Sequence, residues 1–129
     1  MMLENSKAFS SFSVDDLEKA KTFYQSVLGL EVKDNPMGLI ELHIQSSIPV
    51  LIYPKSNHDP ASFTVLNFPV ENVEEMVEDL KAKGVQFEHY DVEGLKTDED
   101  GISRTDGHVV AWFKDPAGNI LSIMKTTAP

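Results

Sequence analysis

The chain has 129 residues, no cysteine, 21 acidic against 11 basic side chains and a formal net charge of −10. Its length predicts one compact domain, and the lack of cysteine excludes disulfide scaffolds, thiolate zinc sites and cysteine nucleophiles. The charge argues against nucleic acid and anionic membranes as partners, because both attract clustered basic side chains. Residues 1–10 show no basic segment followed by an apolar run, and the apolar stretches are too short for a membrane helix. We therefore expect a cytoplasmic protein that neither spans nor binds a membrane.

One pattern of elements occurs twice along the chain. The segments 14–32 and 70–87 both open with a valine and continue through an acidic start, an amphipathic stretch, a glycine and a β-rich run. Apolar residues at helical spacing predict a first helix over 17–28, with Asp16 as N-cap and Gly29 as terminator. The same pattern predicts a second helix that begins after Asn72 and ends at Gly84.

Alternating or continuous apolar runs around the helices predict β-strands. The expected strands are 38–45, 48–53, 63–68, 85–90, 109–114 and 120–125. Ser46 and Ser47 form an expected turn, and residues 115–119 form another because they place a proline and a glycine where a turn needs them. Each half therefore reads β-α-β-β-β, which predicts an α+β fold with module one at about 7–54, a linker at about 55–61 and module two at about 62–127.

Two segments carry a resemblance to a known family. Residues 12–32, Phe-Ser-Val-Asp-Asp-Leu-Glu-Lys-Ala-Lys-Thr-Phe-Tyr-Gln-Ser-Val-Leu-Gly-Leu-Glu-Val, resemble the opening of vicinal oxygen chelate (VOC) proteins. Residues 111–121, Ala-Trp-Phe-Lys-Asp-Pro-Ala-Gly-Asn-Ile-Leu, resemble their closing signature. The resemblance implies a single VOC-type domain over 1–129, whose tandem βαβββ modules form a curved, cleft-bearing sheet with helices on the outer face. It also implies a homodimer, which would cover strand edges.

In metal-dependent VOC members the resemblance implies four ligand positions. In this sequence they fall on Phe9, Leu51, Val65 and Ser122. None of these side chains is the imidazole or carboxylate that a divalent cation needs, so we expect no metal and no other cofactor.

If these four positions face the cleft, residues two apart on the same strands face it too. Glu41 and His43 lie on the polar face of the second expected strand, and Trp112 either lines the cleft or packs under the second helix. Phe9 is expected to form either a pocket wall or ordinary core. The expected ligand pocket is Phe9, Ser11, Ser13, Glu41, His43, Leu51, Tyr53, Phe63, Val65, Asn67, Trp112, Ile120, Ser122 and Met124.

Several other residues have weaker functional interpretations. Glu41 and His43 are the candidate catalytic residues, either as an acid–base pair or as part of a solvated polar face. His108 comes directly after an Asp-Gly turn and is expected at the surface. The acidic segment 90–101 is interpreted as a loop that either covers the pocket edge or meets another subunit.

The sequence supports three hypotheses for function. The first is a metal-free protein that binds a hydrophobic organic molecule in the cleft, with the charge favouring a cation over an anion. The second is a metal-dependent enzyme of the glyoxalase or dioxygenase type that uses His43 and Glu41 as displaced ligands. The third is a metal-free lyase or isomerase with Glu41 or His43 as general base.

Overall fold

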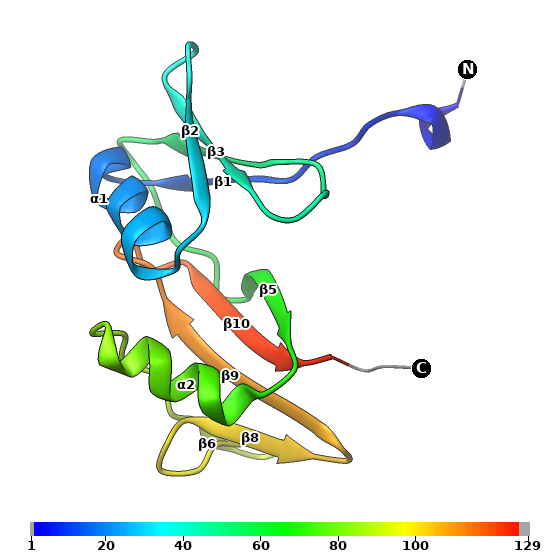
Figure 1. The fold of residues 1–129 in the computed structure, drawn as a ribbon, viewed down its shortest axis with the longest axis vertical. Coiled ribbons are helices and arrows are strands. Elements are labelled where there is room, and N and C mark those ends of the chain that lie inside the picture. Colours follow the sequence, from blue (N-terminus) through cyan, green and yellow to red (C-terminus); the bar gives the residue numbers. More distant parts are fainter. Residues whose placement is uncertain (1, 127–129) are drawn as a thin grey trace. The chain divides into compact units, whose positions relative to one another are not determined.

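The computed structural model describes residues 2–126, and the chain divides into two compact units with the boundary between Asp59 and Pro60. Each unit contains one four-stranded mixed sheet and one α-helix, which confirms the α+β class (Figure 1). The first unit holds a 3-10 turn at Leu3–Asn5, β1 (Ser11–Val14), α1 (Leu17–Thr22), a π-helical turn at Phe23–Val27, β2 (Glu31–Asn35), β3 (Leu39–His43) and β4 (Val50–Pro54). The second holds β5 (Thr64–Val70), α2 (Val73–Ala82), β6 (Asp91–Val92), β7 (Leu95–Lys96), β8 (Ile102–Thr105), β9 (His108–Lys114) and β10 (Ile120–Lys125).

The expected caps hold both helices at their starts. The Asp16 carboxylate accepts from the amide of Lys19 at 3.1 Å, and the Asn72 side-chain oxygen accepts from the amide of Glu75 at 3.0 Å. Gly29 and Gly84 come after the helices with φ values of 73° and 92°, the left-handed backbone that ends a helix with least strain for glycine.

The first helix is less regular than its periodicity predicts. α1 ends at Thr22, and the amide of Leu28 bonds to the carbonyl of Phe23 at 3.0 Å across a widened π-helical turn. A π turn adds a single residue and rotates the positions after it by about 100°, but here it forms the last turn of the helix, so few apolar positions are affected. The sequence pattern therefore located the helix correctly and missed its change of winding.

The first sheet has the strand order β1-β4-β3-β2, with β1 parallel to β4 and the other pairs antiparallel. Because side chains alternate between the faces of a strand, one face carries the apolar residues. That face is fully buried and packs with Ala20 and Tyr24 of the helix; its members are Val14, Ile40, Leu42 and Ile52. Burial of each such aliphatic side chain contributes about 1.5–3 kcal/mol.

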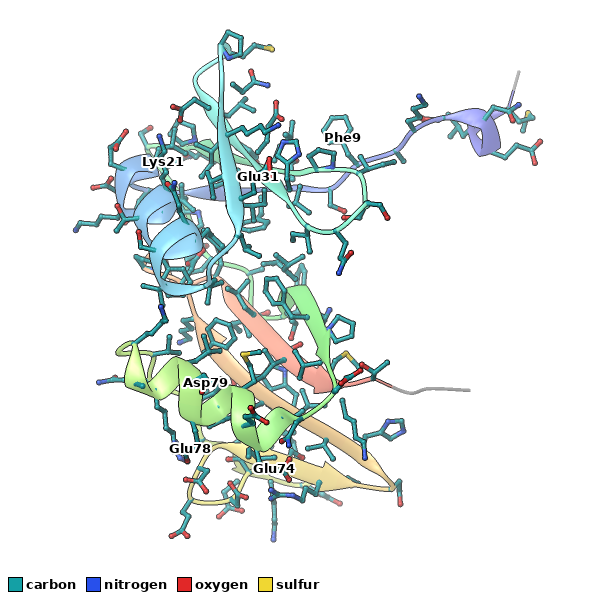
Figure 2. All side chains as sticks on the ribbon, viewed as in Figure 1. Phe9, Lys21, Glu31, Glu74, Glu78 and Asp79 are labelled. Atoms are coloured by element: carbon teal, nitrogen blue, oxygen red, sulfur yellow. The ribbon has the colours of Figure 1, made fainter. Side chains whose placement is uncertain are left out.

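The second sheet repeats this order as β5-β10-β9-β8, with β5 parallel to β10. α2 lies across β9 and β10 (Figure 1), and its Glu74, Glu78 and Asp79 are exposed (Figure 2). The core between helix and sheet is apolar and nearly inaccessible; it consists of Val73, Val77, Leu80, Ala111, Phe113, Leu121 and Ile123.

The expected strand at 85–90 is wrong. Within that segment only Phe87 forms a β-bridge, to Phe113, and the strand that corresponds to β2 of the first unit is β8 at Ile102–Thr105. The Asp106-Gly107 pair joins β8 to β9, with φ values of 52° and 80°, the backbone of a tight hairpin turn that favours Asp-Gly. The hydrophobic pattern favours segment 85–90 because it is rich in β-forming residues. In the structure, the tight turn at Asp106-Gly107 instead makes β8 the partner of β9.

A β-bulge interrupts β5 at Val65. Thr64 pairs with Ile120 and Leu66 with Leu121, so Val65 is an extra residue of β5 that has no partner on β10. A bulge reverses which face the subsequent residues occupy.

Among residues 2–126, no helix has the length and apolar character needed to cross a bilayer.

Candidate functional site

The candidates in the first unit lie on the sheet face that α1 leaves uncovered. Ser11 pairs with Leu51, Leu51 pairs with Glu41, and Ser13 pairs with Tyr53. These residues alternate along the strands with the buried core positions, so they share the opposite face. The expected common face of β1, β3 and β4 is therefore present within this unit.

On this face Glu41 and His43 are in direct contact. The Nε2 atom of His43 lies 2.9 Å from Oε1 of Glu41, and Asn35 donates from its side-chain nitrogen to Oε2 of Glu41 at 2.8 Å. The hydrogen bonds from Asn35 and with His43 lower the pKa of Glu41 below the usual range of a glutamate. The two candidate catalytic residues thus form a pair in which Glu41 is ionised at neutral pH.

Other first-unit candidates are less enclosed. Phe9 precedes β1 and is 60% exposed, so its interpretation as ordinary core is wrong (Figure 2). Tyr53 is 37% exposed. The hydroxyl of Ser13 contacts Nδ1 of His58 at 2.7 Å, which holds the segment after β4 against β1.

The second-unit candidates that pair within the sheet likewise occupy its face opposite α2; they are Asn67, Trp112, Ile120, Ser122 and Met124. Ser122 pairs with Asn67 on one side and with Trp112 on the other, and its hydroxyl donates to the side-chain oxygen of Asn67 at 2.5 Å. Met124 lies further along the same face, beside Val110. Because of its register, Trp112 is on this face and not under α2, which decides between its two expected positions.

A pocket of about 320 Å³ lies entirely within the second unit. It brings together three of the expected ligand residues, Phe63, Trp112 and Ile120, with four that the sequence analysis did not select. Those four are Ser62, Thr64, Tyr90 and Leu95. The pocket is small but falls within the range of organic-ligand sites.

Aromatic rings dominate this pocket. The rings of Tyr90 and Trp112 have their centres 5.5 Å apart with planes at 81°, an edge-to-face pair. Partial burial and, less strongly, the Glu88 carboxylate raise the pKa of the Tyr90 phenol, while Lys114 acts in the opposite direction. Lys114 and Glu88 themselves form an ion pair at 3.4 Å. The phenol is therefore neutral at physiological pH.

The hairpin of β6 and β7 supplies Leu95 to the pocket, and Tyr90 lies directly before this hairpin. Its base is closed by Thr97, whose amide donates to the Tyr90 carbonyl at 2.9 Å and whose hydroxyl accepts from the Tyr90 amide at 2.8 Å. Asp98 anchors the next residues by accepting from the amides of Asp100 and Ile102, both at 2.9 Å. These hydrogen bonds hold the residues that follow the hairpin in place. The acidic segment 90–101, which was expected to be a loop at the pocket edge, thus contributes Tyr90 and Leu95 to one wall of the pocket.

The sequence carried only a partial signal for these additional residues. Tyr90 and Leu95 lie at or inside the segment expected to be a loop at the pocket edge, and Ser62 and Thr64 flank Phe63. The hairpin that directs Tyr90 and Leu95 to Trp112 depends on tertiary contacts, which a periodicity argument does not contain.

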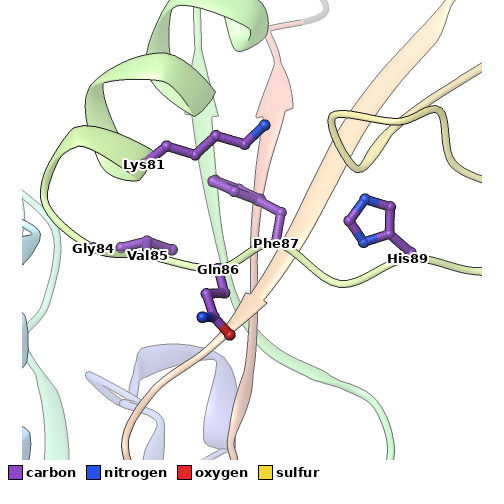
Figure 3. Close-up of a pocket in the computed structure, with 6 residues that line it drawn as sticks. All are labelled: Lys81, Gly84, Val85, Gln86, Phe87 and His89. Carbon is purple, nitrogen blue, oxygen red and sulfur yellow. The ribbon is translucent and has the colours of Figure 1, made fainter.

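A second hollow, of about 610 Å³, lies beside the C-terminal end of α2 (Figure 3). Two of its polar side chains already have partners: Lys81 bonds to Asp100 at 3.0 Å, and Nε2 of His89 donates to the Glu99 carbonyl at 3.0 Å. The residues lining it are Lys81, Gly84, Val85, Gln86, Phe87 and His89. It is therefore the weaker candidate for a ligand site.

The donor chemistry does not fit the metal site that the family resemblance implies. Phe9, Leu51 and Val65 offer no ligand atom, and Ser122 offers a buried hydroxyl that bonds to Asn67. Within residues 2–126, no three His, Cys, Asp or Glu side chains cluster closely enough to hold a metal ion. In the described part of the chain, Glu41 and His43 thus remain a pair without a third ligand of these types.

Solved structures share this fold at low sequence identity. They include lactoylglutathione lyase from Agrobacterium tumefaciens (22% identity, TM-score 0.67, covering 91% of this chain and 90% of that chain). The antibiotic binding protein TnmS3 from Streptomyces sp. CB03234 matches with 20% identity, TM-score 0.68 and coverage of 93% and 96%. The fosfomycin resistance protein FosX from Listeria monocytogenes matches with 18% identity, TM-score 0.69 and coverage of 93% and 92%.

A comparison with curated proteins returned no match. A family model, however, matches residues 9–123, which include both sheets and both helices apart from the end of β10. The matched family is the Glyoxalase/Bleomycin resistance protein/Dioxygenase superfamily. Its name joins several activities, so membership decides the fold and leaves the function to the site. This chain belongs to the Glyoxalase/Bleomycin resistance protein/Dioxygenase superfamily.

Proposed function

We propose that this protein binds a small hydrophobic organic molecule without a metal ion, in the pocket formed by Phe63, Tyr90, Leu95, Trp112 and their neighbours. The pocket itself carries the proposal. Its described lining consists of three aromatic side chains, one of them a phenol, two aliphatic side chains and the hydroxyl side chains of Ser62 and Thr64, the mixture typical of organic-ligand sites. Burial of apolar ligand surface there supplies the driving force for binding.

The chemistry of the implied metal positions supports the metal-free part of this proposal. Phe9, Leu51 and Val65 cannot replace water around a divalent cation. TnmS3, which has the same fold, is described as an antibiotic binding protein. This analogy makes binding without turnover a reasonable role for this chain as well.

The proposed form in solution is a homodimer. The order of the strands leaves β2 and β8 at sheet edges within the chain, and association of two copies is one way to cover such edges. Sedimentation equilibrium tests this point: a mass twice the 14.4 kDa of the chain supports it, and a monomer at micromolar concentration contradicts it.

A second candidate function is proton transfer by the Glu41–His43 pair, as in a metal-free lyase or isomerase. The contact at 2.9 Å favours it. Against it stands the lowered pKa of Glu41, because a general base works best when its pKa lies near the operating pH. Ligand binding is therefore preferred. If a substrate were found, loss of its turnover in both Glu41→Gln and His43→Ala would favour the enzyme.

Trp112 makes the binding proposal directly testable, because it is the only tryptophan in the chain. Its indole N–H gives a single cross-peak in an amide correlation NMR spectrum, and that peak reports on the pocket. Chelator-treated protein is titrated with a panel of small organic compounds. A saturable shift of this peak supports the proposal, and a panel without any shift contradicts it.

Two truncated variants complete the test. Leu95→Ala removes a pocket wall and should weaken binding, whereas Val92→Ala alters an exposed residue of the same hairpin and should not. Equal affinity of both variants would place the binding site elsewhere.

A further inference from the structure

The charge balance of the pocket narrows the kind of molecule that it accepts. None of its described lining residues is ionised at neutral pH: the polar ones are Ser62, Thr64 and Tyr90. The charged side chains that shift the pKa of Tyr90 are Glu88 and Lys114. They shift the pKa of Tyr90 in opposite directions, Glu88 more strongly, and they form an ion pair with each other at 3.4 Å, so neither acts on the pocket as an isolated charge.

A net charge of −10 would attract a cation to the protein surface. Binding in this pocket is a different step, because the cation loses part of its hydration shell and meets no carboxylate in the described lining. Attraction to an exposed ring face is worth about two- to fivefold in affinity. Loss of part of the hydration shell opposes this gain, and no carboxylate in the described lining compensates for it. A cation therefore gains little from this pocket, and an anion meets no basic side chain in the described lining and only the electron-rich faces of the rings.

The geometry of the rings adds a second restriction. Tyr90 and Trp112 both line the pocket, and their planes are almost perpendicular at 81°. A flat aromatic ring that stacks on one of them presents itself edge-on to the other, and both arrangements are favourable. A saturated ring of similar size gains neither, although it buries similar apolar area.

We infer that the pocket of the second unit selects a neutral, planar aromatic compound with one hydrogen-bonding substituent, which the hydroxyls of Ser62 and Thr64 can meet. This inference rests on the proposed function, since it specifies the ligand class of the same site. The net charge of the chain favours a cation, whereas the lining of the pocket favours an uncharged ligand. The lining decides, because the bound ligand contacts only these residues.

Four bicyclic probes of similar size separate the alternatives: naphthol, N-methylquinolinium, naphthoate and decahydronaphthol. The first is neutral and aromatic, the second a cation, the third an anion and the fourth saturated. Dissociation constants are measured at the Trp112 indole cross-peak at neutral pH and physiological salt. We expect naphthol to bind at least about tenfold more tightly than each of the other probes.

Variants locate the effect. Leu95→Ala should weaken naphthol binding by about three- to thirtyfold, and Val92→Ala should leave it unchanged. Equal effects of these two variants would overturn the assignment of the ligand to this pocket.

The remaining outcomes separate the two proposals. If the cation, the anion or the saturated alcohol binds as tightly as naphthol at this site, the inferred ligand class is wrong while the binding function stands. If no probe and no other organic compound shifts the Trp112 signal, both fail.

Discussion

The ring of Tyr90 meets the indole of Trp112 edge to face, with ring centres 5.5 Å apart. Tyr90 precedes the β6–β7 hairpin, and Trp112 lies in the middle of β9. The amide of Glu88 donates to the Trp112 carbonyl at 2.8 Å, so backbone and side chains together join the segment before the hairpin to the sheet. One wall of the pocket therefore depends on this pair.

Removal of the Tyr90 ring should weaken this wall. Tyr90→Ala is expected to lower ligand affinity by about three- to thirtyfold, through loss of the aromatic contact and of apolar area. Tyr90→Phe keeps the ring and should bind within about threefold of the unchanged protein. Calorimetric titration measures both. An equal loss in the two variants would show that the hydroxyl, and not the ring, is the important group.

The cap of each helix should contribute measurably to stability. Asp16→Ala and Asn72→Ala each remove a side-chain acceptor from the first turn and should lower the free energy of unfolding by about 1 kcal/mol. Asp15→Ala is the matched control, since Asp15 is exposed and next to the cap. Urea unfolding gives the values. A loss in the control as large as in Asp16→Ala would indicate a charge effect instead of capping.

The core of the second unit should be sensitive to truncation. Leu121 is fully buried between β5, β9 and α2, so Leu121→Ala should cost about 2–5 kcal/mol of unfolding free energy. Met37 is 83% exposed, and Met37→Ala should change stability by less than about 0.5 kcal/mol. Chemical denaturation compares them; similar stabilities would contradict the burial of Leu121.

Asp98 should make stability depend on pH in the acid range. Burial raises the pKa of Asp98, but hydrogen bonds from Ile102 and Arg104 outweigh it, and the pKa lies below the usual aspartate value. A carboxyl group with a lower pKa in the folded state stabilises the fold above its unfolded pKa. This contribution is lost as pH falls through the folded pKa. We therefore expect stability to decline below about pH 4.

The variant Asp98→Asn isolates this contribution. It should be less stable than the unchanged protein at neutral pH and should show a shallower loss of stability on acidification. Thermal unfolding between neutral and acid pH measures both slopes. Parallel curves would mean that the pKa of Asp98 is the same in the folded and unfolded states.

Local sequence signals were sufficient for most of the fold. Asp16, Asn72, Gly29 and Gly84 mark the helix ends because their requirements are local: a short acceptor at the start and a left-handed residue at the end. The same holds for the 115–119 turn, where the Asp115 amide donates to the Asn119 carbonyl at 3.0 Å. Two family signatures then assigned the repeated modules to a known fold.

The candidate site was only partly accessible in this way. Counting by twos along strands correctly grouped Ser11 and Ser13 on one face, since alternation is a local property of a strand. It did not predict the bulge at Val65, because a bulge changes the face of the residues after it and has no sequence signature of its own. The expected strand at 85–90 failed for a related reason, since strand pairing depends on partners distant in sequence.

The sequence by itself determined where both helices lie, the position of β3, β4, β5, β9 and β10, the family and the absence of imidazole or carboxylate side chains at the implied metal positions. These depend on residue type, periodicity and capping, which act over a few neighbouring residues. Only the tertiary structure decided that Trp112 faces away from α2 and that Tyr90 and Leu95 join it in one pocket. It also showed that this pocket has no ionised group in its described lining although the chain carries a net charge of −10. Net charge is a sum over the whole chain, whereas the cost of desolvation depends only on the groups that the ligand contacts in the pocket.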